Sequence, residues 1–134
     1  GLEDLEKSSR AFLPPLPYFT ADSAYYKRFG ETMGGIHNIS PQFFHAQCLW
    51  DAGMAYSISR HLKKEKPAKV LHLNGSFHSN YKQGTVAQLK RYSKKVKVAN
   101  IDSYGVDPNA EFEPDWDEQL ERADFLILTP EGEE

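Results

Sequence analysis

The chain has 134 residues, 40% of them hydrophobic and 26% charged, which favours a single globular domain with a hydrophobic core. A net charge of −3 without a long basic block excludes the concentrated basic surface of a nucleic-acid-binding protein, and no apolar run reaches the roughly 18 to 20 residues of a membrane span. The single cysteine, Cys48, excludes an internal disulfide, and the acidic residues 1–4 do not predict a signal peptide.

The first segment of the chain predicts little regular structure. Residues 1–10 allow only a weak helix. Residues 11–17 contain three prolines, which predict an extended connector rather than a proline-rich binding motif. We therefore expect residues 1–17 to form an N-terminal segment and connector, and residues 18–134 to form an α/β region.

Two helices are expected next. A glycine pair ends the first of them, over residues 24–33, whose aromatic side chains we expect to pack against a neighbouring element rather than bind a ligand. Ser40 and Pro41 supply a capping hydroxyl and a first-turn proline for the second helix. This helix is expected to end near residue 62 or 64 and to be roughly 35 Å long, at ~1.5 Å per residue.

The second helix carries two polar residues within its apolar stripe. Gln47 and Asp51 are four residues apart and are therefore neighbours on one face. Burying them unpaired costs several kcal/mol, so they either satisfy each other and the nearby backbone or face a binding site. Gly53 favours a site, because a mid-helix glycine costs about 1 kcal/mol relative to alanine. The apolar members of the stripe are Phe43, Phe44, Trp50, Met54, Ala55, Ile58 and Leu62.

A strand, a tight loop and a helix follow. Residues 70–74 are rich in β-forming residues and end at Gly75, a residue that can adopt backbone angles that allow a sharp turn. The loop carries His78 and continues through Gly84 into a helix over residues 85–92. This order is typical of a site at the carboxyl end of a strand in an α/β sheet. A plain turn with a surface histidine is the alternative interpretation.

The remaining segments predict two more strands. Residues 94–102 alternate lysine and valine at their start, and residues 123–130 are a continuous apolar run that fits a strand buried on both faces. Between them lie a loop over residues 104–116 and a short helix, for which Asp115 and Glu118 form a capping box. The fold class is therefore α/β, with a small, mostly parallel sheet, flanking helices and an N-terminal helical portion.

Three strands leave apolar edges exposed, and proteins normally cover such edges. We therefore expect this chain to be an incomplete half of a larger α/β domain. A missing N-terminal half or a second copy, as in a homodimer, would complete the sheet.

Three motifs occur in order along the chain: Gln47-x-x-Trp50-Asp51-x-x-Met54-Ala55, then Gly75-x-x-His78-x-x-Tyr81 followed by Gly84 and Leu89, then Ala123-Asp124-Phe125-Leu126-Ile127-Leu128-Thr129-Pro130. Together they resemble the C-terminal half of the ChaN-like haem-binding uptake family, in the Tiki and erythromycin-esterase superfamily, over about residues 16–130. The resemblance implies a bacterial envelope lipoprotein of haem or iron uptake, with haem as its ligand and a lipid anchor outside this chain.

The chain departs from the family pattern in two ways. Family members have an upstream strand that ends in Gly-Glu-x-His and supplies the other wall of the site, and no such stretch is present here. The family loop is usually Gly-x-Gly-His, whereas Phe77 stands where the second glycine would be. A bulky ring there would narrow the pocket or stack on a flat ligand.

The residues themselves are suited to haem. Haem iron accepts histidine or tyrosine as an axial ligand, and His78 and Tyr81 lie on one short loop. Gln47 and Asp51 are expected to orient His78 or the loop rather than contact iron. The apolar surface for the macrocycle would come from Trp50, Phe77 and Met54.

Two other functions remain open. The superfamily contains hydrolases, with or without a metal, and His78 with Asp51 would then serve as a base and its orienting carboxylate. A structural or interaction half-domain without a ligand is the other alternative. We rank non-catalytic haem binding first, interaction second and hydrolysis third.

Overall fold

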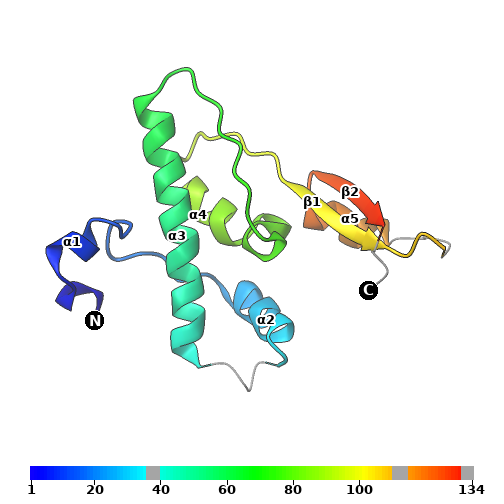
Figure 1. Cartoon of the computed structure of the whole chain (residues 1–134), viewed down its shortest axis with the longest axis horizontal. Helices are drawn as coiled ribbons and strands as arrows, with labels where there is room; N and C mark the ends of the chain where they lie inside the picture. The colour runs from blue at the N-terminus through cyan, green and yellow to red at the C-terminus, as the bar shows by residue number, and fades with distance from the viewer. Residues whose placement is uncertain (36–39, 110–114, 131–134) are drawn as a thin grey trace.

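The computed structural model describes residues 1–35, 40–109 and 115–130. A long helix, α3, runs through the middle of the molecule, with α1 on one side and the two strands with α5 on the other (Figure 1). The elements are η1 (Leu2–Asp4), α1 (Lys7–Arg10), α2 (Ser23–Thr32), α3 (Pro41–Lys64), η3 (Ser76–His78), η4 (Asn80–Lys82), α4 (Gly84–Tyr92), β1 (Ile101–Val106), α5 (Trp116–Arg122) and β2 (Phe125–Pro130).

The ends of α2 and α3 follow from local sequence. The Oδ1 atom of Asp22 accepts a hydrogen bond from the Tyr25 backbone N–H at 3.0 Å and caps α2, and Gly34 ends it with a φ of +87°. Pro41 occupies the first turn of α3, as predicted. The prediction that the Ser40 hydroxyl caps α3 is wrong, because this side chain makes no capping hydrogen bond.

The main aromatic core lies between α2, the first half of α3 and the η3 turn. Tyr25 and Phe77 stack with ring centroids 5.1 Å apart, and Phe29 packs against both Phe44 at 5.6 Å and Phe77 at 5.7 Å. Cys48 is fully buried in the same cluster. The aromatic residues of α2 therefore pack against neighbouring elements, as the sequence predicts.

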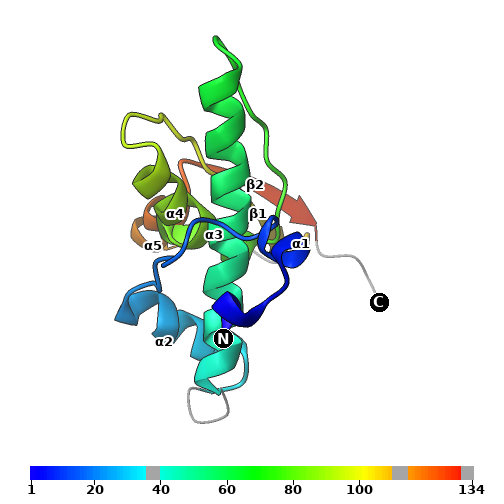
Figure 2. The same cartoon turned by 90° about the vertical axis from the view of Figure 1, so that its left-hand side faces the viewer.

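α4 packs against the second half of α3, as both views show (Figures 1 and 2). Ala52 and Ala55 are fully buried on α3, and small side chains there allow a close approach of the two helices. Ser59 and Ser93 form a hydrogen bond of 3.0 Å between their hydroxyls at the end of α4. This contact fixes the end of α4 beside the second half of α3.

β1 and β2 form a parallel pair with a register from Ile101 opposite Phe125 to Val106 opposite Pro130. The connection between them includes α5, so the predicted strand–helix–strand order and the mixed α/β class are confirmed. The prediction that residues 123–130 are buried on both faces is wrong. Ile127 and Leu128 point to opposite faces and are 55% and 44% exposed.

Two other strand predictions are corrected. Residues 70–74 are extended but form no strand, because no neighbouring strand supplies hydrogen bonds to them in the described part of the chain. Leu71 and Leu73 are accordingly 82% and 83% exposed. The strand expected over residues 94–102 begins only at Ile101 and continues through Val106, so the lysine–valine alternation marks an irregular segment.

None of the described helices is long and apolar enough to span a membrane.

Candidate functional site

The two short turns between residues 75 and 83 place His78 against the middle of α3. The loop closes with three residues in left-handed conformations, Tyr81 at φ +58°, Lys82 at +56° and Gly84 at +49°. A Cβ at Gly84 would lie 2.5 Å from the His78 carbonyl oxygen, so only glycine fits there. The role expected of Gly75 is wrong, since its φ of −61° is open to any residue. Gly84 supplies the special conformation instead.

A buried carboxylate lies at the centre of this site. The side chain of Asp51 is fully buried on α3 and accepts three hydrogen bonds. Their donors are the Tyr25 hydroxyl at 2.6 Å, His78 Nδ1 at 2.8 Å and the Thr85 hydroxyl at 3.0 Å. The donors come from α2, the loop and α4, so one carboxylate joins three elements. These three hydrogen bonds explain how α3 tolerates a charged side chain in its apolar stripe.

The contacts of His78 define its tautomer. Nδ1 lies 2.8 Å from Asp51 Oδ1 and 3.0 Å from Gln47 Nε2, and these neighbours require opposite roles of that nitrogen. The hydrogen bond to the charged carboxylate is the stronger of the two. We therefore assign the proton to Nδ1, which donates it to Asp51. Nε2 then carries the free lone pair. It has no hydrogen-bond partner among the described residues, and the side chain is 20% exposed.

Tyr25 and Gln47 complete the network around the carboxylate. The Gln47 amide nitrogen donates to the Tyr25 hydroxyl at 3.1 Å, which in turn donates to Asp51. Burial, together with the negative charge of Asp51, raises the pKa of Tyr25 far above its usual range. Tyr25 is therefore a permanent hydrogen-bond donor that fixes the position of Asp51. The structure thus brings together Gln47, Asp51 and His78, three of the residues singled out from the sequence.

The other candidate residues lie around this centre. Trp50 is 67% exposed and Phe43 61% exposed, so neither joins the core as the predicted apolar stripe required. With Met54 they form the α3 apolar strip, since Phe43, Trp50 and Met54 are spaced seven and four residues apart on the flank of α3 that carries Gln47. Ala52, Ala55 and Ser59 occupy the flank toward α4. The α3 apolar strip therefore lies on the flank away from α4, and Gln47 on that flank lies 3.0 Å from His78 Nδ1.

Phe77 and Tyr81 occupy different surroundings. Phe77 lies in the aromatic core, in contact with Tyr25 and Phe29, and holds the loop there. The Tyr81 hydroxyl donates to Glu118 Oε1 on α5 at 3.3 Å. Burial, with the charge of Glu118 and its hydrogen bond, raises the pKa of Tyr81, so the phenol keeps its proton at neutral pH.

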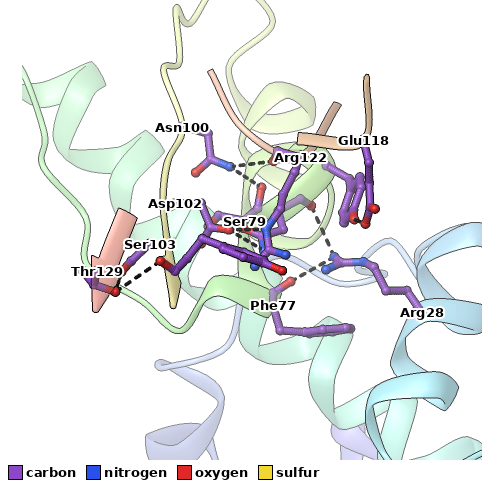
Figure 3. Close-up of polar contacts among 12 residues, drawn as sticks. Arg28, Phe77, Ser79, Asn100, Asp102, Ser103, Glu118, Arg122 and Thr129 are labelled. Carbon is purple, nitrogen blue, oxygen red and sulfur yellow. Dashed lines mark hydrogen bonds and ion pairs between the residues drawn. The ribbon is translucent and has the colours of Figure 1, made fainter. Parts of the chain in front are cut away.

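A second polar cluster holds the loop from the side of the sheet (Figure 3). Asp102 on β1 is buried, forms an ion pair with Arg122 and accepts a hydrogen bond from Asn80 Nδ2 at 3.1 Å. The Asn100 amide donates to the Ser79 carbonyl at 3.0 Å. Lys82 forms an ion pair with Asp124 at 2.7 Å. Each of residues 79–82 therefore contacts β1, α5 or a residue at their ends.

Burial opposes ionisation of Asp102, but hydrogen bonds from Ser76 and Arg122 outweigh it and lower its pKa. The carboxylate is therefore charged over the neutral range. This cluster was missed in the sequence because its members are common polar residues scattered between positions 79 and 124. Tyr25 and Thr85 were missed as partners of Asp51 for the same reason.

The donor set restricts what the site can bind. The described residues contain no group of three or more histidine, cysteine, aspartate or glutamate side chains that could hold a metal ion. A bare zinc ion needs about three or four protein ligands. Haem iron takes four nitrogens from its own ring and needs only one or two from the protein. One oriented imidazole beside an exposed apolar strip therefore suits haem better than a bare ion.

Comparison with known proteins gives one match. A family model described as "Haem-binding uptake, Tiki superfamily, ChaN" matches residues 1–89, about two-thirds of the chain. The matched range includes α2, α3 and the His78 loop, and it stops before the third motif at residues 123–130. Neither the curated proteins nor the solved structures gave a match.

Proposed function

This chain belongs to the ChaN family of haem-binding uptake proteins in the Tiki superfamily, and from that membership we propose that it binds haem, without catalysing a reaction, at His78. One observation carries the proposal: the 2.8 Å contact of His78 Nδ1 with the buried Asp51 carboxylate. This contact fixes the orientation of the ring and leaves Nε2 as the ligand atom. Carboxylate–imidazole pairs support metal-binding histidines in this way.

Different residues of the chain would orient the histidine ligand and contact the macrocycle. Asp51 orients the imidazole, Tyr25 holds Asp51, and Gln47 donates to the Tyr25 hydroxyl. Bound haem would supply a ferric or ferrous centre for axial ligation. The α3 apolar strip, with Trp50 at its centre, would cover one part of the macrocycle. Tyr81 is the second candidate ligand, but its phenol must lose a proton held by a raised pKa before it can bind iron.

Equilibrium titration tests this proposal. Haemin should produce a saturable Soret shift in the wild-type chain, whereas iron-free protoporphyrin should bind at least about tenfold more weakly, because it lacks the axial bond. Equal affinity for the two porphyrins would reduce the site to an apolar surface. Absence of saturable binding by either porphyrin would contradict the proposal.

Hydrolysis is the second candidate function, because the same Asp51–His78 pair matches a general base and its orienting carboxylate. An activated ester such as p-nitrophenyl acetate is the simplest probe. Turnover that His78→Ala removes would favour the hydrolase. Turnover that is equal in the wild type and the variant would exclude His78 as a base for that substrate.

We also propose that further strands complete the sheet. Parallel sheets are normally buried on both faces, whereas β2 exposes apolar side chains on both. Residues 70–74 pair with no strand in the described part of the chain. A missing N-terminal half or a second copy of this chain would cover them. Light scattering separates the two, since a dimer mass supports a second copy. A monomer that becomes more stable when the upstream half is added supports the missing half.

For its place in the cell, we propose the bacterial envelope, with attachment through a lipid anchor outside this chain. Fractionation of cells that express the full-length protein tests this. Recovery with membranes is the expected result, and recovery in the cytoplasm would contradict it.

A further inference from the structure

Arg28 on α2 reaches the site loop from the side opposite the Asp102 cluster. Its Nε donates to Gln83 Oε1 at 3.0 Å, and its Nη2 donates to the carbonyls of Phe77 at 3.0 Å and Asn80 at 3.3 Å. One guanidinium therefore contacts the loop before His78, between His78 and Tyr81, and after Tyr81. Figure 3 shows its approach to the Phe77 carbonyl.

The rings of the loop also pack on this guanidinium. Its Cζ lies 4.3 Å from the centroid of Phe77 and 5.1 Å from that of Tyr81. Such cation–π contacts are favourable when the cation is partly desolvated, and the Arg28 side chain is half-buried. The planar fork of arginine serves several acceptors at fixed angles, which the single ammonium of lysine cannot do.

The loop requires an external restraint of this kind. Tyr81 and Lys82 hold left-handed backbone angles that cost non-glycine residues of order 1 kcal/mol or more each, so the surrounding structure must stabilise them. Arg28 lies one helical turn after Tyr25, and the two residues act on different parts of the site. Tyr25 fixes the carboxylate that orients His78, and Arg28 fixes the backbone from which His78 and Tyr81 project.

We propose that Arg28 is the positioning residue of the haem site, which holds the loop over residues 77–83 so that His78 and Tyr81 keep a fixed relation to each other. The role of this restraint in ligand binding rests on the proposed haem function. The restraint itself can be measured in the ligand-free protein.

The test compares Arg28→Lys with the wild type in two measurements. In the ligand-free chain, hydrogen exchange follows the loop amides that are hydrogen-bonded, those of His78, Ser79, Lys82 and Gln83. We expect them to exchange at least about tenfold faster in the variant, because charged hydrogen bonds of this type are lost. In the haemin titration, we expect at least about tenfold weaker binding and a shifted Soret maximum, which a merely stabilising residue would not change.

Arg91→Lys is the matched control, since that guanidinium also packs on a ring, Phe19 at 3.7 Å, away from the loop. It should change neither measurement. If Arg28→Lys does not fold, Gln83→Leu removes one acceptor of the guanidinium and should give a smaller change of the same kind.

Unchanged loop exchange in a folded Arg28→Lys would overturn the proposal. So would faster exchange with wild-type haemin affinity and spectrum. If the wild type itself does not bind haemin, the proposed function fails, and the exchange measurement alone decides whether Arg28 positions the loop.

Discussion

Replacing Asp51 by asparagine tests the buried network with almost no change in side-chain volume. The carboxylate accepts hydrogen bonds from Tyr25, His78 and Thr85, at 2.6, 2.8 and 3.0 Å. Asparagine offers one acceptor oxygen and turns the other position into a donor. At least one of the three donors must then face an N–H group and lose its partner.

The expected cost follows from those contacts. The two bonds that survive lose their charged acceptor, at about 1 kcal/mol each, and a donor left unpaired in the interior costs about 1–3 kcal/mol. Removing a fully buried charge recovers part of its desolvation penalty. We therefore expect Asp51→Asn to lower the free energy of unfolding by about 2–4 kcal/mol, a large fraction of the stability of a domain of this size.

Urea unfolding followed by circular dichroism measures this change, which should lower the midpoint by about 1 to 2 M. Glu31→Gln is the control, because Glu31 is exposed and pairs with Lys27 at 3.7 Å. It should change stability by less than about 0.5 kcal/mol. A loss for Asp51→Asn no larger than that of the control would refute the view that this carboxylate joins α2, the loop and α4.

Three further predictions follow from single contacts. Gly84→Ala should lower the free energy of unfolding by about 2 kcal/mol or more in urea, because the φ of Gly84 is +49° and a Cβ would lie 2.5 Å from a backbone oxygen. Gly75→Ala should be tolerated, and equal effects of the two substitutions would contradict this. Trp50→Ala should weaken haemin binding at least about fivefold and leave stability nearly unchanged. Trp116→Ala removes a tryptophan of similar exposure on α5 and should change neither property. Equal haemin affinity of the two variants would remove the α3 apolar strip from the site. The lowered pKa of Asp102 stabilises the fold at pH values above its unfolded-state pKa of about 3.9, and this contribution is lost as the pH falls through the folded-state pKa. The wild type should therefore lose more stability than Asp102→Asn between about pH 5 and about pH 2. Parallel curves of unfolding free energy against pH for the two proteins would contradict this.

The helices could be predicted from the sequence because their signals are local. A proline in the first turn and a basic last turn bound α3, and the predicted end at residue 62 or 64 agrees with Lys64. The spacing of Gln47 and Asp51 placed both on one face, and the structure brings both to His78. Two polar residues in an apolar stripe were therefore a correct indication of a shared polar centre.

The strands were predicted less well because a strand depends on a partner as well as on its own residues. Residues 70–74 have strand-forming side chains but no neighbouring strand among the described residues, so they remain extended and exposed. The same absence leaves both faces of β2 open. Periodicity placed Trp50 and Phe43 in one apolar stripe, but it cannot distinguish a buried flank of a helix from an exposed apolar one.

The contacts that hold the His78 loop could not be predicted from the sequence, for a different reason. Arg28 contacts the loop across about fifty residues, and its acceptors are mostly backbone carbonyls, which leave no residue-specific signal. The left-handed conformation was assigned to Gly75, whereas the structure places it at Tyr81, Lys82 and Gly84. Backbone conformation inside a loop is determined by tertiary contacts that spacing does not encode.

Replacing the imidazole of His78 tests whether its Nε2 atom binds haem iron. Haemin should give a saturable Soret shift with the wild type and with Tyr81→Phe. His78→Gly should lose the shift or bind at least about tenfold more weakly, and free imidazole should restore the wild-type spectrum by occupying the vacated space. Wild-type binding by His78→Gly, or loss of binding in Tyr81→Phe instead, would contradict the assignment of His78 as the iron ligand.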